Sequence, residues 1–514
     1  MISSSKSDTY SLKVRALIMQ FINVFGRRLL AAIICLNLIG FSTSASSETP
    51  LTTSDEGSRL PMLGDSVSAT ISPEKEFRVG RAWLRMLRSR APIIDDPITQ
   101  DFAEHFIYHL ASNSELQNPK IEVIIIDSPE INAFAVPGGV IGINGGTFLA
   151  ADNADEMASV LSHELAHLSQ RHYARSVEEA SKNQWASMAA LLATVVLAAR
   201  GGFDAGMATL ATSQAAAMQN QLQFSRQNEQ EADRIGMQTL VNSGYDPHAM
   251  PRFFETLQKT MQYSGFKTPE YLLTHPLTEN RIADVKNRAE KFPSPSTTHV
   301  DKEFEVVRAR LLVDFSADKA GLIKQFQQSI SQNAGIQSEV AKYGLAYAYL
   351  KNNQFDEAQK NAQALLQNDP HRISYIQLLG ETEISSNKPD QAVSLIKKAM
   401  ESSPDNYPLN TTLAQALVRN KQYSAATDIL QSLSRQRPTD PAVWESLSEA
   451  YGYVNNIIGV HQAQAEVLFL SGNTDSAIQQ LAFAANLAKD NFQLVSKIKY
   501  RETEMRVAQQ DLRL

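Results

Sequence analysis

Hydrophobic residues in the first part of the chain follow two different periods. Apolar residues recur at helical spacing in four segments, which predicts helices over 74–89, 97–113, 154–180 and 226–244. Residues 121–127, "IEVIIID", form a β-branched run and predict a buried strand. Between 131 and 148, two Gly pairs interrupt alternating apolar positions, which predicts a second strand, a tight turn and a third strand. This part is therefore expected to be mainly α with a small β-sheet.

The second part of the chain repeats itself every 34 residues. The positions that keep this spacing are Leu345, Leu379 and Leu413; Ala346, Gly380 and Ala414; Ala358, Ala392 and Ala426; and Pro370, Pro404 and Pro438. This period and residue pattern are typical of tetratricopeptide repeats, which stack into an α-solenoid whose concave face usually binds peptide or protein. A further repeat opens at Trp444, and the phase then slips, because Ala477 lies 51 residues beyond Ala426.

A Pro- and Ser-rich segment without periodicity, 292–303, separates the two patterns and is interpreted as a linker. We expect one domain over 76–291 and a repeat domain over 304–514. Residues 46–75 are rich in Ser and Thr and are expected to form a flexible lead.

The N-terminus predicts export. Arg27 and Arg28 precede a thirteen-residue apolar run and then small residues, which is typical of a signal peptide over 1–45. An uncleaved anchor is the alternative. The only cysteine, Cys35, lies within this segment, so neither a disulfide framework nor a Cys-based zinc site is expected. The formal net charge of −7 gives no support to a nucleic-acid role, and the bacterial-style signal indicates the periplasm.

The helix predicted over 154–180 carries His163 and His167, four residues apart, with Glu164 beside the first. Positions i and i+4 differ by about 40° around a helix, so both imidazoles could hold one cation. Glu164 lies roughly 100° round from His163 and could reach a metal-bound water as general base. The spacing is that of zincins, and the alternative is a helix face with three polar residues.

His105 and His109 have the same spacing but lack an adjacent Glu. We interpret them as partly buried structural histidines.

A hydrolytic zinc site needs a third protein ligand and an open fourth position. Glu229 and Asp233 share one face of the helix predicted over 226–244, so one carboxylate could bind the metal while the other accepts the N–H of a ligand histidine. Glu231 lies on a different face and is expected to be solvated. Spacing alone does not select this helix over other acidic helices.

Three segments together resemble the HtpX and CAAX-prenyl-protease family of zinc metallopeptidases: "SHELAH" at 162–167, "SRQNEQEAD" at 225–233 and "HPLTENRIAD" at 275–284. The resemblance implies a zincin-type (gluzincin) metallopeptidase domain that holds one Zn²⁺ per chain. The residues that it assigns are His163, His167 and Glu229 as metal ligands, Glu164 as the catalytic base and Asp233 as the support of a ligand.

The His-Pro motif of the family falls on His275 and Pro276. Three roles for His275 stay open. Its imidazole could occupy the open zinc position and keep the enzyme latent, it could donate a hydrogen bond to the tetrahedral oxyanion, or it could cap a helix that begins near Pro276.

In zincins an extended substrate adds as a strand to a sheet edge beside the metal. Residues 132–143 resemble the family segment at that position, and a purely structural hairpin is the alternative.

Residues 185–199 are uncharged but short for a transmembrane helix, which needs roughly 20 residues. We expect an amphipathic or buried helix over the active site, followed by a Met- and Ala-rich lid up to residue 222, with a membrane span as the alternative.

Signal peptide, catalytic domain and repeats together narrow the resemblance to periplasmic members. It implies an endopeptidase and chaperone in the quality control and assembly of outer-membrane β-barrel proteins. The clients would be misfolded or stalled outer-membrane proteins, and the repeats would bind the barrel-assembly machinery. A peripheral contact with the membrane stays open. The alternative function is a repeat-based chaperone or adaptor with a structural metal site and little proteolysis.

Overall fold

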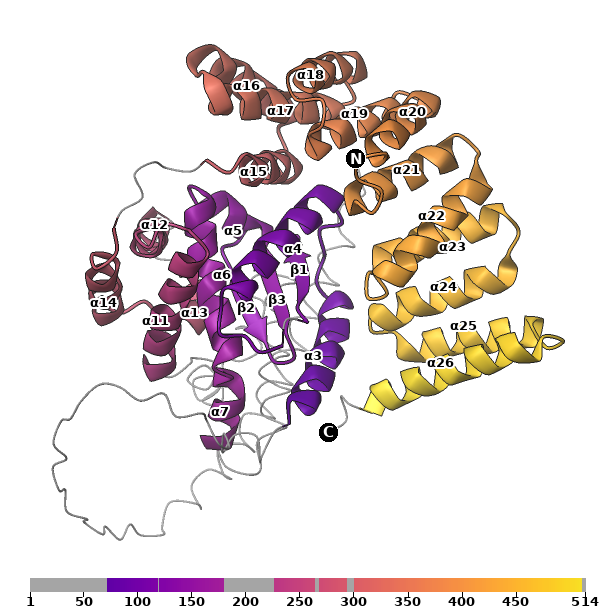
Figure 1. The fold of residues 1–514 in the computed structure, drawn as a ribbon, viewed down its shortest axis with the longest axis horizontal. Coiled ribbons are helices and arrows are strands. Elements are labelled where there is room, and N and C mark those ends of the chain that lie inside the picture. Colours follow the sequence, from indigo (N-terminus) through magenta and orange to yellow (C-terminus); the bar gives the residue numbers. More distant parts are fainter. Residues whose placement is uncertain (1–71, 119, 180–225, 264–267, 294–299, 511–514) are drawn as a thin grey trace, which may run out of the picture. The chain divides into compact units, whose positions relative to one another are not determined.

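The computed structural model describes residues 72–118, 120–179, 226–263, 268–293 and 300–510. This part of the chain is mainly helical and holds one three-stranded sheet, which confirms the expected fold class (Figure 1). None of its helices is long and apolar enough to cross a membrane.

Several expectations lie outside the described residues. They concern the signal peptide over 1–45, the lead up to residue 71, the apolar helix over 185–199 and its sequel to residue 222.

The elements of the first part of the fold are α3 (Pro73–Arg88), α4 (Pro97–Ser112), β1 (Glu122–Ile126), β2 (Ala133–Val136), β3 (Val140–Asn144), α5 (Gly145–Ala150), α6 (Ala154–Ser169), α7 (His172–Glu179), α11 (Arg226–Asn242), α12 (Ala249–Tyr263), α13 (Glu270–Thr274) and α14 (Glu279–Ala289).

The sheet has the strand order β1–β3–β2. Strand β1 runs parallel to β3, with Val123 opposite Ile141, and β2 runs antiparallel to β3. Gly138 and Gly139 make the turn from β2 to β3 at φ values of 82° and 76°, a left-handed conformation that is costly for residues with a Cβ. The expected strand, turn and strand are confirmed, and β2 is an edge strand that contacts α6 (Figure 1).

Helix α6 is central to the core of this part. Every residue from Ala154 to His167 is buried, and apolar residues such as Leu161 and Leu165 belong to the largest hydrophobic cluster. A helix buried on all sides offers its polar side chains no water. Each of them therefore needs a partner within the protein.

The prediction of one continuous helix over 154–180 is wrong. Helix α6 ends at Ser169, α7 begins at His172, and Arg171 between them has a φ of 50°. The side chain of Arg171 reaches α3, where its Nε lies 3.3 Å from Oε2 of Glu76. Contacts of this kind, between segments far apart in the sequence, leave no trace in the apolar period of the helix.

The repeat helices are α15 (Lys302–Phe315), α16 (Lys319–Gln332), α17 (Gly335–Lys351), α18 (Phe355–Asn368), α19 (Ile373–Ser385), α20 (Pro389–Met400), α21 (Tyr407–Arg419), α22 (Tyr423–Gln436), α23 (Pro441–Tyr453), α24 (Ile457–Leu470), α25 (Thr474–Leu487) and α26 (Phe492–Gln510).

Turns between the repeat helices confirm the predicted period. Asn353, Asn387, Lys421 and Asn455 follow one another at intervals of 34 residues, with φ values of 59°, 61°, 58° and 62°. Gly472, at φ 82°, comes only 17 residues after Asn455. The four earlier turns each lie between the two helices of one repeat. Gly472 lies between α24 and α25, where the connection to the next repeat would come, so the pattern restarts half a repeat early and the phase slips.

Ion pairs join the repeats to α4. Arg310 on α15 is 2% exposed, and its Nη2 lies 2.6 Å from Oδ1 of Asp96, which caps the N-terminus of α4. The same Nη2 lies 3.1 Å from Oε1 of Glu381 on α19. Farther along, Nη1 of Arg437 donates to Oε2 of Glu104 on α4 at 2.8 Å. Breaking such a buried pair from one side leaves an uncompensated charge, so the two parts support each other.

Helix α3 contacts the last repeat helices. Arg85 donates to the backbone carbonyl of Ala508 on α26 at 3.1 Å and lies over the ring of Phe469 on α24 at 4.7 Å. At the same place Gly472 approaches α3 so closely that a Cβ would lie 2.6 Å from the carbonyl oxygen of Arg85. Glycine is therefore required here both by its positive φ and by this contact.

The left-handed turn at Lys421 predicts a stabilising substitution. A left-handed residue with a Cβ costs roughly 1–2 kcal/mol, and Gly or Asn tolerates this conformation better. We expect Lys421→Asn and Lys421→Gly to raise the free energy of unfolding by about 0.5–1 kcal/mol, measured by calorimetry. Lys398→Asn, within α20, is the matched control and should lower stability instead. A loss of stability in both Lys421 variants would contradict the argument that the left-handed backbone at this position is costly for lysine.

Candidate metal centre

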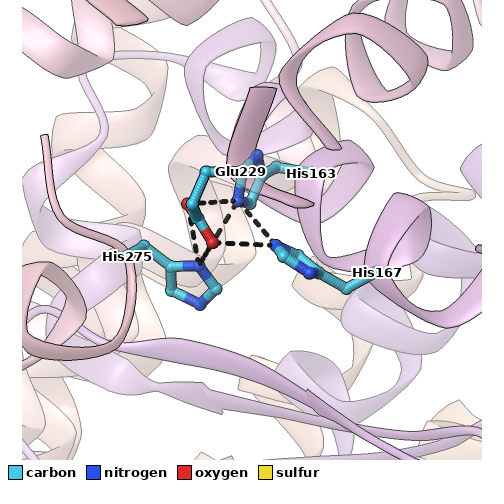
Figure 2. A group of neighbouring side chains, drawn as sticks. All are labelled: His163, His167, Glu229 and His275. Atoms are coloured by element: carbon cyan, nitrogen blue, oxygen red, sulfur yellow. Dashed lines mark hydrogen bonds and ion pairs between the residues drawn. The ribbon is translucent and has the colours of Figure 1, made fainter. Parts of the chain in front are cut away.

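Four buried side chains from three segments converge on one point (Figure 2). His163 and His167 come from α6, Glu229 comes from α11, and His275 follows α13. Their exposed fractions lie between 1% and 4%. Each offers one ligand atom, and these atoms all lie within 4.8 Å of one another.

The separations suit a single metal ion. Nε2 of His163 lies 3.0 Å from Nε2 of His167 and 3.5 Å from Oε2 of Glu229, while Oε1 of Glu229 lies 3.4 Å from Nε2 of His167. Ligand atoms at about 2.0–2.1 Å from a tetrahedral ion are separated by roughly 3.3 Å. The nitrogen and carboxylate donors thus fit a metal both in chemistry and in spacing.

Glycine brings the two ligand helices together. A Cβ on Gly236 of α11 would lie 3.0 Å from the backbone N and Cα of His163 and from the carbonyl oxygen of Ser162. The missing side chain lets α11 approach α6 closely. Glu229, two turns earlier on α11, is thereby brought to the histidines.

Asp233 supports His163. Its Oδ1 lies 3.0 Å from Nδ1 of His163, so the ring nitrogen that faces away from the centre has a carboxylate partner. Arg281 donates to both oxygens of Asp233 at 2.7 Å, and its Nη1 lies 2.7 Å from Oε2 of Glu229. Sequence reasoning did not assign this role to Arg281, because no spacing rule links it to a carboxylate 48 residues earlier.

The expectation that Glu231 is solvated is wrong. Its side chain is 28% exposed, and its Oε2 lies 3.1 Å from Nε2 of His172 and 2.9 Å from Nη2 of Arg175. His172, which is fully buried, in turn places Nδ1 at 2.9 Å from Nδ1 of His167. Sequence reasoning missed His172 because a continuous helix would turn it away from His167.

Glu164 lies beside the centre without being one of the converging ligands. It is 1% exposed, and its Oε1 is without a hydrogen-bond partner among the described residues, although Nε2 of His275 is 3.5 Å away. Burial raises the pKa of the Glu164 carboxyl, while nearby His275 and His163 and the backbone N–H of Ala135 on β2 oppose this rise. A carboxyl held in this way can accept a proton and keep it.

His275 does not cap the helix that follows it. The N-cap of α14 is Thr278, whose side chain accepts the backbone N–H of Arg281. His275 instead ends α13, and its Nδ1 lies 3.1 Å from Oε1 of Glu229 and 3.4 Å from Nε2 of His163. The capping role considered for His275 is therefore wrong, and the two roles at the centre remain.

His105 and His109 lie elsewhere, on α4. Both are exposed rather than partly buried as expected. His109 hydrogen-bonds to the carbonyl of Ser243, and His105 hydrogen-bonds to the carbonyl of Asp101.

Comparisons with known proteins extend over both parts of the chain. Residues 98–289 match the family model described as Peptidase family M48, and residues 383–450 match the model described as Tetratricopeptide repeat. The beta-barrel assembly-enhancing protease of Escherichia coli (strain K12) is 34% identical over 435 residues, which cover 85% of this chain and 88% of that protein.

A putative beta-barrel assembly-enhancing protease of Vibrio cholerae is 33% identical over 432 residues, covering 84% of this chain and 88% of that protein. The mitochondrial metalloendopeptidase OMA1 of Arabidopsis thaliana is 31% identical over 189 residues, covering 37% of this chain and 36% of that protein.

The electrostatics of the centre predict that metal binding releases a proton. Burial alone would lower the pKa of His163, but its hydrogen bonds to Asp233 and Glu229 raise it to about 9. The pKa of His167 is held well below its usual value by burial and by His163. At pH 7 the metal must therefore displace a proton from His163.

Apparent metal affinity should consequently rise by up to about tenfold per pH unit toward pH 9. Calorimetric titrations at pH 7 in two buffers of different ionisation enthalpy would measure the released proton. Equal binding enthalpies in the two buffers would contradict the prediction.

Proposed function

We propose, from the premise that the chain belongs to peptidase family M48 and is a metalloprotease with tetratricopeptide repeats, that it is a periplasmic zinc endopeptidase. The observation that carries the proposal is the buried convergence of His163, His167 and Glu229 beside Glu164. Two imidazoles and one carboxylate are a ligand set of catalytic zinc sites.

Bound zinc would supply a Lewis acid that lowers the pKa of a water molecule and polarises the peptide carbonyl. Glu164 would take the proton of this water on its carboxyl and later pass it to the leaving amine. The raised pKa of Glu164 suits this role, since the carboxyl must hold the proton between the two steps. Asp233 and Arg281 keep the ligands His163 and Glu229 in place.

His275 would close the fourth position and keep the resting enzyme latent. Its Nδ1 belongs to the group of converging ligand atoms, which supports this role. Its Nε2, 3.5 Å from Oε1 of Glu164, supports the alternative role of oxyanion stabiliser once the ring has swung away from the ligands.

Substrate would add as a strand to the outer edge of β2, which pairs with no strand other than β3 among the described residues. This strand contacts α6, and the N–H of Ala135 on it lies beside Glu164. Main-chain hydrogen bonds read no side chains, so unfolded or extended segments of many sequences would be accepted.

The clients would be misfolded or stalled outer-membrane β-barrel proteins, and the repeats would bind the barrel-assembly machinery. This part of the proposal rests on the similarity to proteins named beta-barrel assembly-enhancing protease, whose length the chain covers to 88%. The competing function is a chaperone or adaptor with a structural metal. The buried Oε1 of Glu164, which makes no hydrogen bond to the described residues, favours the protease, because a structural site does not need that carboxyl.

Metal content and proteolysis test the proposal together. Purified wild type and Glu164→Gln should each hold about one zinc per chain, while Glu229→Ala should lose it. Glu255→Ala, on the surface of α12, is the matched control and should keep it. Glu164→Gln should lower cleavage of an unfolded fluorescent protein by about 10²–10⁴-fold, because the general base is gone.

Absence of bound zinc from the wild type would overturn the zinc centre. Full rescue of a deletion strain by Glu164→Gln would overturn the protease function in favour of the adaptor.

The role of His275 predicts a gain of activity. If its imidazole closes the fourth position, His275→Ala should raise cleavage of the same unfolded protein by about tenfold or more, since the competent state becomes the dominant one. A fall of about 10²–10³-fold would instead assign the oxyanion role. His105→Ala, an exposed histidine of α4, should change nothing.

A further inference from the structure

A break in the helix places a further histidine, His172, behind the metal centre. His172 follows His167 by five residues, and in a continuous helix two such residues would point about 140° apart. Because α6 ends at Ser169 and Arg171 adopts a φ of 50°, His172 instead turns back toward α6. Its Nδ1 lies 2.9 Å from Nδ1 of His167, with the two rings at 78° to each other.

The contacts of His167 and His172 define where their protons are. Nε2 of His167 faces the converging ligands, and a nitrogen that binds a metal carries no proton. The proton of neutral His167 is therefore on Nδ1, which donates to Nδ1 of His172. Since that nitrogen accepts, His172 carries its own proton on Nε2, which donates to Oε2 of Glu231 at 3.1 Å.

The row of hydrogen bonds from His167 through His172 to Glu231 ends at Arg175. Nη2 of Arg175 lies 2.9 Å from the same Oε2 of Glu231 and holds the carboxylate toward His172. On the other side of the centre, Arg281 holds Asp233, and Asp233 accepts directly from Nδ1 of His163. Each of the two ligand histidines is thus supported by a carboxylate that an arginine holds. Asp233 contacts His163 directly, and Glu231 supports His167 through His172.

We propose that His172 and Glu231 are positioning residues of the metal centre, which hold His167 in its Nδ1–H tautomer with Nε2 toward the metal. The inference rests on the proposed function, because it assumes that His167 is a zinc ligand. His172 contacts His167 through the ring nitrogen that faces away from the converging ligand atoms, so it would act on the metal through His167.

Metal affinity tests the proposal. Loss of a partner behind a ligand histidine typically weakens metal binding by about 10–100-fold. His172→Leu, which has no acceptor for Nδ1–H of His167, should weaken zinc binding by this amount in a competition titration with a chromogenic chelator. His172→Asn, whose Oδ1 can accept in place of Nδ1, should restore most of the affinity. Glu231→Ala should weaken binding less than His172→Leu does.

A purely structural role of His172 would give a different result. The melting temperature of the metal-free protein is measured for each variant, and a structural role would lower it equally for the Leu and Asn variants without rescue of affinity by Asn. His109→Leu, which removes an exposed histidine bonded to a backbone carbonyl, is the matched control. The Co²⁺ absorption spectrum of each variant reports the ligand field directly.

Wild-type affinity in both His172→Leu and Glu231→Ala would overturn the inference and leave the proposed function intact. If His172→Leu does not fold, wild-type affinity in Glu231→Ala, together with an unchanged Co²⁺ spectrum of that variant, would do the same. A wild-type protein that binds no zinc would instead defeat the proposed function.

Discussion

Two buried carboxylates share one buried guanidinium, and the arrangement of the centre depends on this pairing. Glu229 and Asp233 are 2% and 1% exposed, and Arg281, at 3%, contacts both. Burial alone would raise the pKa of each carboxyl, but their charged neighbours hold the pKa of Glu229 well below its usual value and lower that of Asp233. Charges of this kind persist in a protein interior only when they are paired and hydrogen-bonded. His275 and His163 together with Arg281 keep Glu229 ionised, as its proposed role of metal ligand requires, and Arg281 keeps Asp233 ionised as an acceptor for His163.

The sequence predicted the parts of the centre that follow from helical geometry. His163, Glu164 and His167 could be recognised because their spacing within one helix fixes their relative directions. Glu229 required a resemblance, since acidic residues on other helices have equal spacing. The repeats could be predicted in the same way as the histidine pair, because a 34-residue period, like the spacing of the two histidines, is read directly from the sequence.

The supporting residues could not be found in this way. Arg281 meets its carboxylates through packing of α14 on α11, and His172 meets His167 only because Arg171 leaves the helical conformation. Arg281 thus depends on a contact between segments that are far apart in the sequence, whereas His172 depends on a local break in the helix. The wrong prediction of a single helix over 154–180 and the wrong prediction of a solvated Glu231 therefore have one cause.

Arrays of repeats usually unfold from their ends, because a terminal repeat has a neighbour on one side only. Here the last repeat helices have a second neighbour, since Arg85 of α3 contacts Ala508 and Phe469 while Gly472 packs on the backbone of α3. Fraying of α26 would break contacts with the catalytic part of the chain as well as with α25. The C-terminal end of the array is thereby coupled to the first helix of the described chain, and local opening there becomes more cooperative than in a linear solenoid.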